Sequence, residues 1–221
     1  MQVKDTALRA RNKLLSEKLL KNLKQRNFEA YYCDTKEAAA EKALSLILEG
    51  DTVSWGGSVT LEECGLLARV KETHTVIDRD TAESGEARVA LMRQALLCDT
   101  YLTSFNAISE DGILVNIDGA GNRIAAIAYG PKSVIAVIGM HKVCKTVEDA
   151  VTRARTYAAP NNALRLTQDT AHTMEKTPCV ITGACGNCKA DDCICSHVVM
   201  TRMCKPAGRI KIILVGESLG L

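Results

Sequence analysis

The chain has 221 residues, of which 47% are hydrophobic and 24% charged, and its 28 basic and 26 acidic side chains give a formal net charge of +2. This length and composition are typical of a globular protein that buries a sizeable core, and the near balance of charge gives no reason to expect a nucleic acid or an acidic membrane as partner. The N-terminus has no apolar signal segment, and no apolar run is long enough to span a bilayer. We therefore expect a cytoplasmic protein without a membrane span, whose thiols stay reduced.

The first half of the chain alternates helices and strands. Leucines at helical spacing predict an N-terminal helix over residues 5–26. Short apolar runs predict strands, and capping and periodicity signals predict the helices between them. The predicted strands cover residues 28–33, 51–55, 75–78 and 99–104, and the predicted helices cover residues 34–48, 60–71 and 85–97.

The second half begins with a different rhythm. Residues 112–117 and 123–129 read as two strands around a Gly-rich turn, as in a hairpin. Residues 134–138 are continuously apolar, which is typical of a strand buried on both faces. A helix is predicted over residues 147–157, ended by Pro160, and a polar irregular segment over residues 161–177. Two strands, over residues 198–203 and 210–215, close the chain.

Strands that alternate with helices predict an α/β fold, with three α/β/α layers and a mostly parallel sheet. We expect one domain over residues 1–221, with a Cys-rich segment, residues 178–197, inserted between late strands. No P-loop ending follows the Gly-rich turn at Gly56, and no nicotinamide or flavin motif is visible. Nucleotide-dependent classes of enzyme are therefore not indicated.

Five of the ten cysteines lie in this Cys-rich segment, at Cys179, Cys185, Cys188, Cys193 and Cys195. In a reducing compartment, such clustering favours metal binding or redox chemistry over disulfides. No histidine lies inside the cluster, so an all-sulfur site is expected, and thiolates favour zinc and iron–sulfur clusters. The spacing alone leaves structural zinc and a 4Fe–4S cluster equally open.

Two polar loops indicate a binding site. Consecutive small residues from Gly56 to Thr60, between a predicted strand and helix, either present N–H groups to an anion or form a tight capped turn. Asn116 interrupts an apolar run, which indicates a polar group aimed at a site. Glu110 is a candidate carboxylate nucleophile or general base, with a simple turn residue as the alternative.

Several of these segments carry a family resemblance. Trp55–Leu61 resembles a loop of the lactate-utilisation (LUD) domain family, and residues 103–112 and 114–123 look like its most recognisable block. Ala158–Ala163 and the cysteine segment from Thr182 extend the match. The resemblance implies the fold shared by ribose-5-phosphate isomerase, glucosamine-6-phosphate deaminase and the CoA transferases. It also implies an association with oxidation of lactate to pyruvate beside iron–sulfur partner proteins.

The resemblance bears on individual residues too. Four cysteines recur in the tail of the short form of the family, and they match Cys179, Cys185, Cys188 and Cys195, whereas Cys193 departs from the pattern. The segment from Ser109 is similar to the one that holds the nucleophilic Glu of class I CoA transferases, with Asp111 in place of the usual Asn. In the sugar-phosphate isomerases of this fold, an acid stands where this chain has Asn106.

Our expectation is a lactate-utilisation-type protein that binds a small anionic metabolite and holds an iron–sulfur cluster or zinc on the four matching cysteines. It would act in oxidation of lactate or a related 2-hydroxy acid, with an iron–sulfur redox partner, and the sequence allows a homo-oligomer. The alternatives are a group-transfer or isomerase enzyme for acyl-CoA or phosphosugars that uses Glu110, and a ligand-binding protein without turnover. The candidate ligand-binding residues are Gly56, Gly57, Ser58, Thr60, Asn106, Asn116, Asp118 and Arg123.

Overall fold

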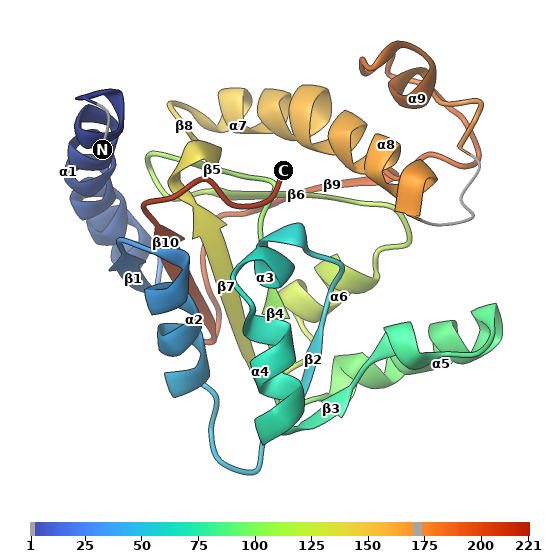
Figure 1. Ribbon diagram of the computed structural model, residues 1–221, viewed down its shortest axis with the longest axis horizontal. Coiled ribbons are helices and arrows are strands. Elements are labelled where there is room, and N and C mark those ends of the chain that lie inside the picture. Colours follow the sequence, from blue (N-terminus) through green and yellow to red (C-terminus); the bar gives the residue numbers. More distant parts are fainter. Residues whose placement is uncertain (1–2, 170–173) are drawn as a thin grey trace.

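A six-stranded parallel sheet forms the centre of the molecule in a computed structural model, which describes residues 3–169 and 174–221 (Figure 1). The strand order is β1-β10-β7-β4-β2-β3. The strands are β1 (Glu29–Cys33), β2 (Thr52–Trp55), β3 (Thr75–Ile77), β4 (Thr100–Thr103), β7 (Ser133–Gly139) and β10 (Ile210–Val215). The predicted α/β fold with a mostly parallel sheet is confirmed.

Strand β7 shows why this sheet is buried on both faces. Its alternate residues Val134, Ala136 and Ile138 belong to one core cluster, whereas Ile135 and Val137 belong to another. All five are fully buried. Successive side chains of a strand point to opposite faces, so a continuously apolar strand needs cover on both sides.

Helices provide that cover. On one face lie α1 (Val3–Gln25) and α6 (Asn122–Ala128), and on the other lie α2 (Lys36–Ser45), α3 (Val59–Glu63) and α4 (Leu66–Thr73). Helix α5 (Gly85–Gln94) follows β3 at the edge of the sheet (Figure 1). Across the described part of the chain, no helix has both the length and the apolar character needed to cross a bilayer.

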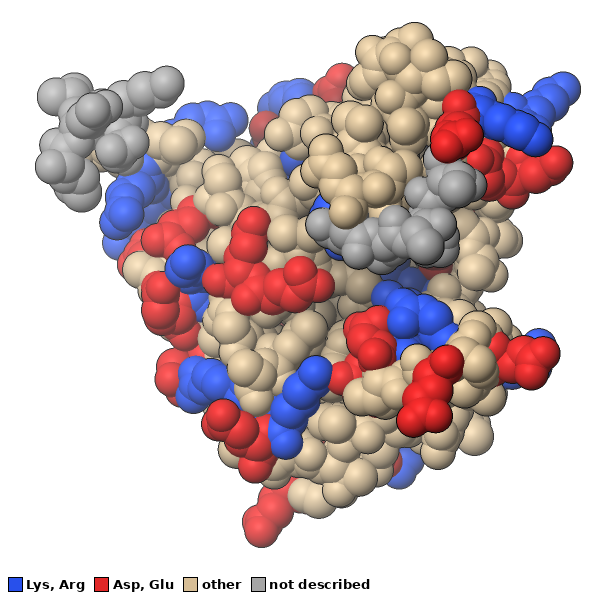
Figure 2. Space-filling model, turned by 45° about the vertical axis from the view of Figure 1, so that its right-hand side comes forward, with Lys and Arg blue, Asp and Glu red and all other residues tan. Residues whose placement is uncertain are grey.

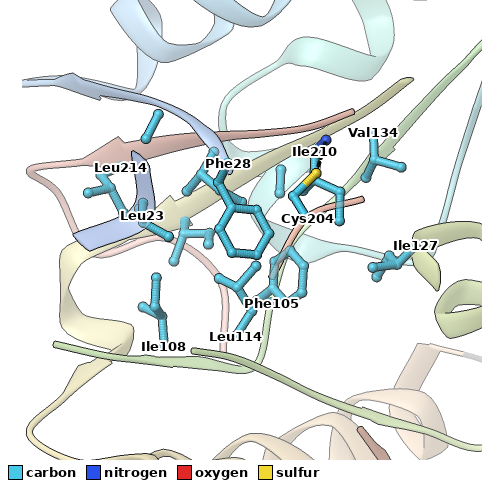
Figure 3. Packing of buried hydrophobic residues seen from close by; sticks show 14 of the residues in the cluster. Leu23, Phe28, Phe105, Ile108, Leu114, Ile127, Val134, Cys204, Ile210 and Leu214 are labelled. Atoms are coloured by element: carbon cyan, nitrogen blue, oxygen red, sulfur yellow. Dashed lines mark hydrogen bonds between the residues drawn. The ribbon is translucent and has the colours of Figure 1, made fainter. Parts of the chain in front are cut away.

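A second sheet, which the sequence analysis did not predict, packs beside the first. Its order is β8-β5-β6-β9, and β6 runs antiparallel to both β5 and β9. The strands are β5 (Ala107–Ser109), β6 (Leu114–Asp118), β8 (Val143–Cys144) and β9 (His197–Thr201). Figure 3 shows Ile108 and Leu114 of this sheet in one core with Leu23 and Phe28, so α1 and both sheets share a hydrophobic cluster.

The predicted strand over residues 123–129 is wrong, because this segment forms α6. The Asp118 carboxylate accepts hydrogen bonds from the backbone N–H groups of Arg123 and Ile124, at 3.0 and 3.1 Å. Gly121 adopts a φ of 85° directly before the helix. The side-chain cap satisfies two of the N–H groups that the first turn of a helix leaves unpaired, and alanines then favour the helix.

The predicted helix end at Pro160 is also wrong. Helix α7 (Val147–Arg153) continues through a π-helical turn, η4 (Ala154–Ala158), into α8 (Ala159–Asp169). The wider π turn ends two residues before Pro160, which has no N–H to donate to it. Of the predicted irregular segment, residues 161–169 are therefore helical, and residues 170–173 lie outside the described residues.

Candidate functional site

A cavity of about 360 Å³ lies beyond the carboxyl ends of the parallel strands. Its walls include Gly57–Thr60 after β2, Arg79 after β3, Ser104–Asn106 after β4 and Lys142 after β7. The strand order reverses between β2 and β4, because β3 continues on one side and β7 on the other. Open α/β sheets bind ligands at such a reversal, outside the carboxyl ends of the strands.

Further walls come from outside the main sheet. The end of β6 and the turn after it contribute residues 117–120, and α8 contributes Asn162 and Arg165. Figure 2 shows Lys and Arg side chains in the recess on the right of the molecule. The cavity is therefore a cleft that the second sheet and α8 close over the edge of the first.

The glycine pair after β2 lets two arginines approach the loop. A Cβ added at Gly57 would lie 2.7 Å from Nη2 of Arg79, and one added at Gly56 would lie 3.1 Å from Cδ of Arg123. Ser58 caps α3, since its hydroxyl accepts the N–H of Leu61 at 3.4 Å. The tight capped turn is thus present, and its glycines leave space for guanidinium groups.

Arg123 is held by the loop after β4 and by the end of β6. Its Nη2 donates to the backbone oxygen of Ile117 and to Oδ1 of Asn106, the latter at 3.3 Å. Asn106 Oδ1 also accepts the N–H of Ile117, at 2.8 Å. Burial lowers the pKa of Arg123, and the Asp118 carboxylate opposes that shift. Asn106 and Asp118 therefore position the arginine that faces the cavity.

Arg79 reaches the same cavity from the end of β3. Its Nε is buried without a hydrogen-bond partner, and its nearest acid is Oδ1 of Asp80 at 3.9 Å. Arg88 of α5 takes the shorter contact to that carboxylate oxygen, at 2.8 Å. A buried guanidinium N–H without a partner is costly, so Arg79 is suited to an anionic acceptor.

Lys142, at the end of the 3₁₀ turn η3 (Met140–Lys142), is a lining residue that the sequence analysis missed. It is only 3% exposed, and its Nζ lies 3.0 Å from Oγ1 of Thr60 and 3.5 Å from Oγ of Ser104. Burial lowers its pKa to about 7, and the charges of Arg153 and Arg123 act in the same direction. A substantial share of the amine is therefore neutral near pH 7.

The charge of the cavity is strongly one-sided. Among the described residues that line it, five side chains are basic and one is acidic, Asp118, whose carboxylate already caps α6. The basic residues are Arg79, Arg88, Arg123, Lys142 and Arg165. Converging cations with low-dielectric walls attract small anions and hold them through charge-assisted hydrogen bonds.

The structure brings most of the candidate ligand-binding residues together. Gly57, Ser58, Thr60, Asn106, Asp118 and Arg123 line the cavity. Gly56 and Asn116 are not among its lining residues. Asn116 is buried, and its amide donates to the backbone oxygen of Ser104 at 3.4 Å, so it supports a lining residue from behind.

Glu110 lies elsewhere. Its carboxylate forms ion pairs with Lys18 of α1 and with Lys145, both at 2.9 Å, and it does not line the cavity. Hydrogen bonds from Lys18 and then Lys145 lower its pKa. Asp111 of the same turn pairs with Arg26, the residue directly after α1, at 2.6 Å. This turn therefore ties α1 to the second sheet.

In the Cys-rich segment the described thiols are neighbours, but they are not arranged as a metal site. Burial raises the pKa of Cys179, and the charges of Cys185, Cys188 and Cys193 raise it further, so these thiols lie near one another. Yet no three or more His, Cys, Asp or Glu side chains within residues 3–169 and 174–221 are grouped to hold a metal ion. The donor chemistry suits zinc or an iron–sulfur cluster, whereas the arrangement is not a preassembled site.

The segment also touches the cavity. Ile194, between two of the cysteines, lines it, and a Cβ added at Gly119 would lie 3.3 Å from the Ile194 Cα. Cys195 packs against the cluster beneath α7. The segment is therefore packed onto the second sheet beside the cavity.

The positions of Arg79 and Lys142 after predicted strands could have identified them as residues that line the cavity. Each follows a predicted strand within a few residues, and the carboxyl ends of parallel strands gather at one edge. Arg165 had no such signal, because the segment around it was predicted to be irregular and instead forms α8. Its guanidinium contacts Oδ1 of Asn162 at 3.0 Å.

Comparisons with known proteins agree with this architecture. A DUF162 family protein from Deinococcus radiodurans matches with a TM-score of 0.52 at 12% identity, over 92% of this chain and 98% of that chain, which shows a shared fold. The eIF2B beta and delta proteins of Chaetomium thermophilum match over 52% and 53% of this chain, and 44% and 50% of their own, at 22% and 21% identity, with TM-scores of only 0.37 and 0.33. No curated protein matches the sequence. A model of the LUD domain matches residues 16–215, and the chain therefore belongs to the LUD domain family.

Proposed function

We propose that the cavity binds a small carboxylate or phosphate anion, and that the protein acts on lactate or a related 2-hydroxy acid. The observation that carries the first part is the excess of basic over acidic side chains around the cavity. Membership of the LUD domain family supports the second part. The proposal includes the predicted ligand residues Gly57, Thr60 and Arg123.

The dimensions and chemistry of the cavity favour a small metabolite. A volume of about 360 Å³ is near the lower end of ligand sites. Arg79 and Arg123 approach the loop after β2, and the hydroxyl groups of Thr60 and Ser104 lie next to Lys142. Guanidinium groups bind carboxylates well, and hydroxyl groups can bind the oxygen on the neighbouring carbon.

Calorimetric titration with lactate, pyruvate and inorganic phosphate tests this site. Arg79→Gln should weaken binding of the preferred anion by about ten- to a hundredfold, because one charge-assisted hydrogen bond contributes about 1.5–3 kcal/mol. Arg93→Gln is the matched control, since Arg93 is exposed on α5 and does not line the cavity. Absence of binding for all three anions, or equal affinities of wild type and Arg79→Gln, would contradict the proposal.

We further propose that Cys179, Cys185, Cys188 and Cys195 hold an iron–sulfur cluster or zinc. The mutual proximity of the thiols supports this assignment. A cluster would supply one-electron transfer, and zinc would only brace the segment. A partner protein would have to accept the electrons, because no nicotinamide or flavin motif is visible in the sequence.

Metal and sulfide content, with an absorption spectrum of protein purified without oxygen, distinguishes these readings. Iron with equal sulfide supports electron transfer, whereas a colourless sample with zinc rules out the redox role. Cys185→Ser should lose the metal, and Cys33→Ser, outside the segment, should keep it. Full metal content in Cys185→Ser would contradict the assignment of that ligand.

A further inference from the structure

The position of Lys142 is unusual for a lysine. It lies shortly after β7, in which every residue from Val134 to Gly139 is buried, and it is itself only 3% exposed. Its Nζ lies within hydrogen-bond distance of two hydroxyl groups, those of Thr60 and Ser104. None of the ion pairs among the described residues includes it, so the structure gives this amine no carboxylate partner. Buried lysines are rare unless paired.

The surroundings of Lys142 favour the neutral amine. Besides burial, Arg153 of α7 and Arg123 of α6 repel a proton on Nζ, and Glu63 at the end of α3 attracts one weakly. His141, its neighbour in the chain, is also held neutral by burial, which lowers its pKa to about 4. A neutral lysine amine is a nucleophile, and enzymes obtain one by desolvation or by neighbouring cations.

We propose that Lys142 forms an imine with the carbonyl carbon of a small 2-oxo acid held in the cavity. This inference rests on the proposed anion site, because the arginines must hold the carboxylate. In a 2-oxo acid, the ketone is directly bonded to the carboxylate carbon. An anion bound by Arg123 would thus present its carbonyl group to the wall formed by Thr60, Ser104 and Lys142.

The step balances without any further reactant. The Nζ lone pair forms a bond to the carbonyl carbon, and the carbonyl oxygen takes up a proton from the nitrogen to give a carbinolamine. Loss of that hydroxyl group as water then gives the imine, so one amine and one ketone yield one imine and one water. The hydroxyl groups of Thr60 and Ser104 lie where they can exchange hydrogen bonds with the departing oxygen.

Borohydride trapping tests the proposal, because it reduces an imine to a stable secondary amine. The full chain is incubated with pyruvate and sodium cyanoborohydride, and intact mass and peptide mapping locate the adduct. We expect one adduct per chain on Lys142, and none when pyruvate is replaced by lactate, which has no carbonyl group to condense. Lys142→Arg, which keeps a positive charge, should form no adduct, and Lys145→Arg should form it at the wild-type rate.

Calorimetry on the same samples separates this inference from the proposed function. Pyruvate binding with no adduct, or with adducts spread over exposed lysines, would overturn the imine and leave the anion site intact. No binding of pyruvate, lactate or phosphate would overturn both. An adduct on Lys142 whose formation Arg79→Gln slows at least fivefold, in step with weaker binding, would support both.

Discussion

Replacement of Lys142 by methionine should stabilise the folded protein. The side chain is 3% exposed, and its amine is paired with hydroxyl groups only. Methionine has a similar length and no charge to desolvate, so it can occupy the same space. A residue that costs stability yet lies in a ligand cavity is the expected pattern for a functional group.

The magnitude follows from the pKa. A fall from the ordinary 10.5 to about 7 corresponds to at most about 5 kcal/mol, at about 1.4 kcal/mol per pH unit. Loss of the hydrogen bond to Thr60 offsets about 1 kcal/mol, and relaxation around a buried charge reduces the remainder. We expect Lys142→Met to raise the free energy of unfolding by about 1–3 kcal/mol near pH 7.

The pH dependence gives the sharper test. The unfolded chain keeps the lysine proton up to about pH 10.5, whereas the folded chain loses it near pH 7. Between these values the unfolded state binds more protons, so the stability of the wild type rises with pH. The advantage of Lys142→Met should therefore be full at and below about pH 7 and shrink by about half or more by about pH 9.

Urea unfolding of both proteins at several pH values measures this difference. Lys21→Met is the control, because Lys21 is exposed on α1, and its difference from wild type should stay small at every pH. A Lys142→Met protein that is less stable than wild type near pH 7 would refute the reasoning. So would an advantage that does not change between about pH 7 and about pH 9.

Three further substitutions probe the cavity and its supports. Gly57→Ala places a Cβ 2.7 Å from Nη2 of Arg79, so anion affinity measured by calorimetry should fall about tenfold; an unchanged affinity would contradict the role of that arginine. Asp118→Ala removes the cap of α6 and should lower the free energy of unfolding, measured with urea, by about 1–2 kcal/mol. An unchanged free energy of unfolding would contradict the role of Asp118 as the cap of α6. Glu110→Gln breaks ion pairs with exposed lysines, so stability should change by less than about 1 kcal/mol and anion affinity should not change; weaker binding would show that Glu110 acts on the cavity.

The main sheet could be predicted because its strands are short apolar runs between clear helix signals. β7 is the strongest case, since a continuous apolar run of that length is typical of a strand buried on both faces. The second sheet could not be predicted as a unit. Its strands β5 and β8 have three and two residues, too few for a period to be recognised, and β9 is distant in sequence from its partner β6.

The site could be predicted where backbone chemistry dictated it. The glycines after β2 predicted a loop that either presents N–H groups to an anion or forms a tight capped turn. The structure has the capped turn, and arginine side chains lie against its glycines. The nature of those groups was not predictable from the loop alone. Arg79, Arg123 and Lys142 are distant in sequence. The parallel order of β3 and β7 brings Arg79 and Lys142 to one edge, whereas Arg123 comes from α6, which follows β6 of the second sheet. The strand predicted over residues 123–129 was wrong for a local reason, because the helix that forms there depends on a cap by Asp118, several residues earlier.

The Cys-rich segment forms part of the cavity wall, so the proposed metal site and the proposed anion site are in contact. The sequence predicted this segment as an insertion between late strands. In the structure Ile194 lines the cavity, and its backbone packs against Gly119 in the turn before α6. Asp118, directly before Gly119, accepts a hydrogen bond from the backbone N–H of Arg123 and so fixes the first turn of α6. Since close-packed elements transmit displacement, a metal that drew the thiols together would act on the turn that positions this arginine. If both proposals hold, metal binding should therefore change anion affinity, because residues 118–123 lie between the Cys-rich segment and the cavity.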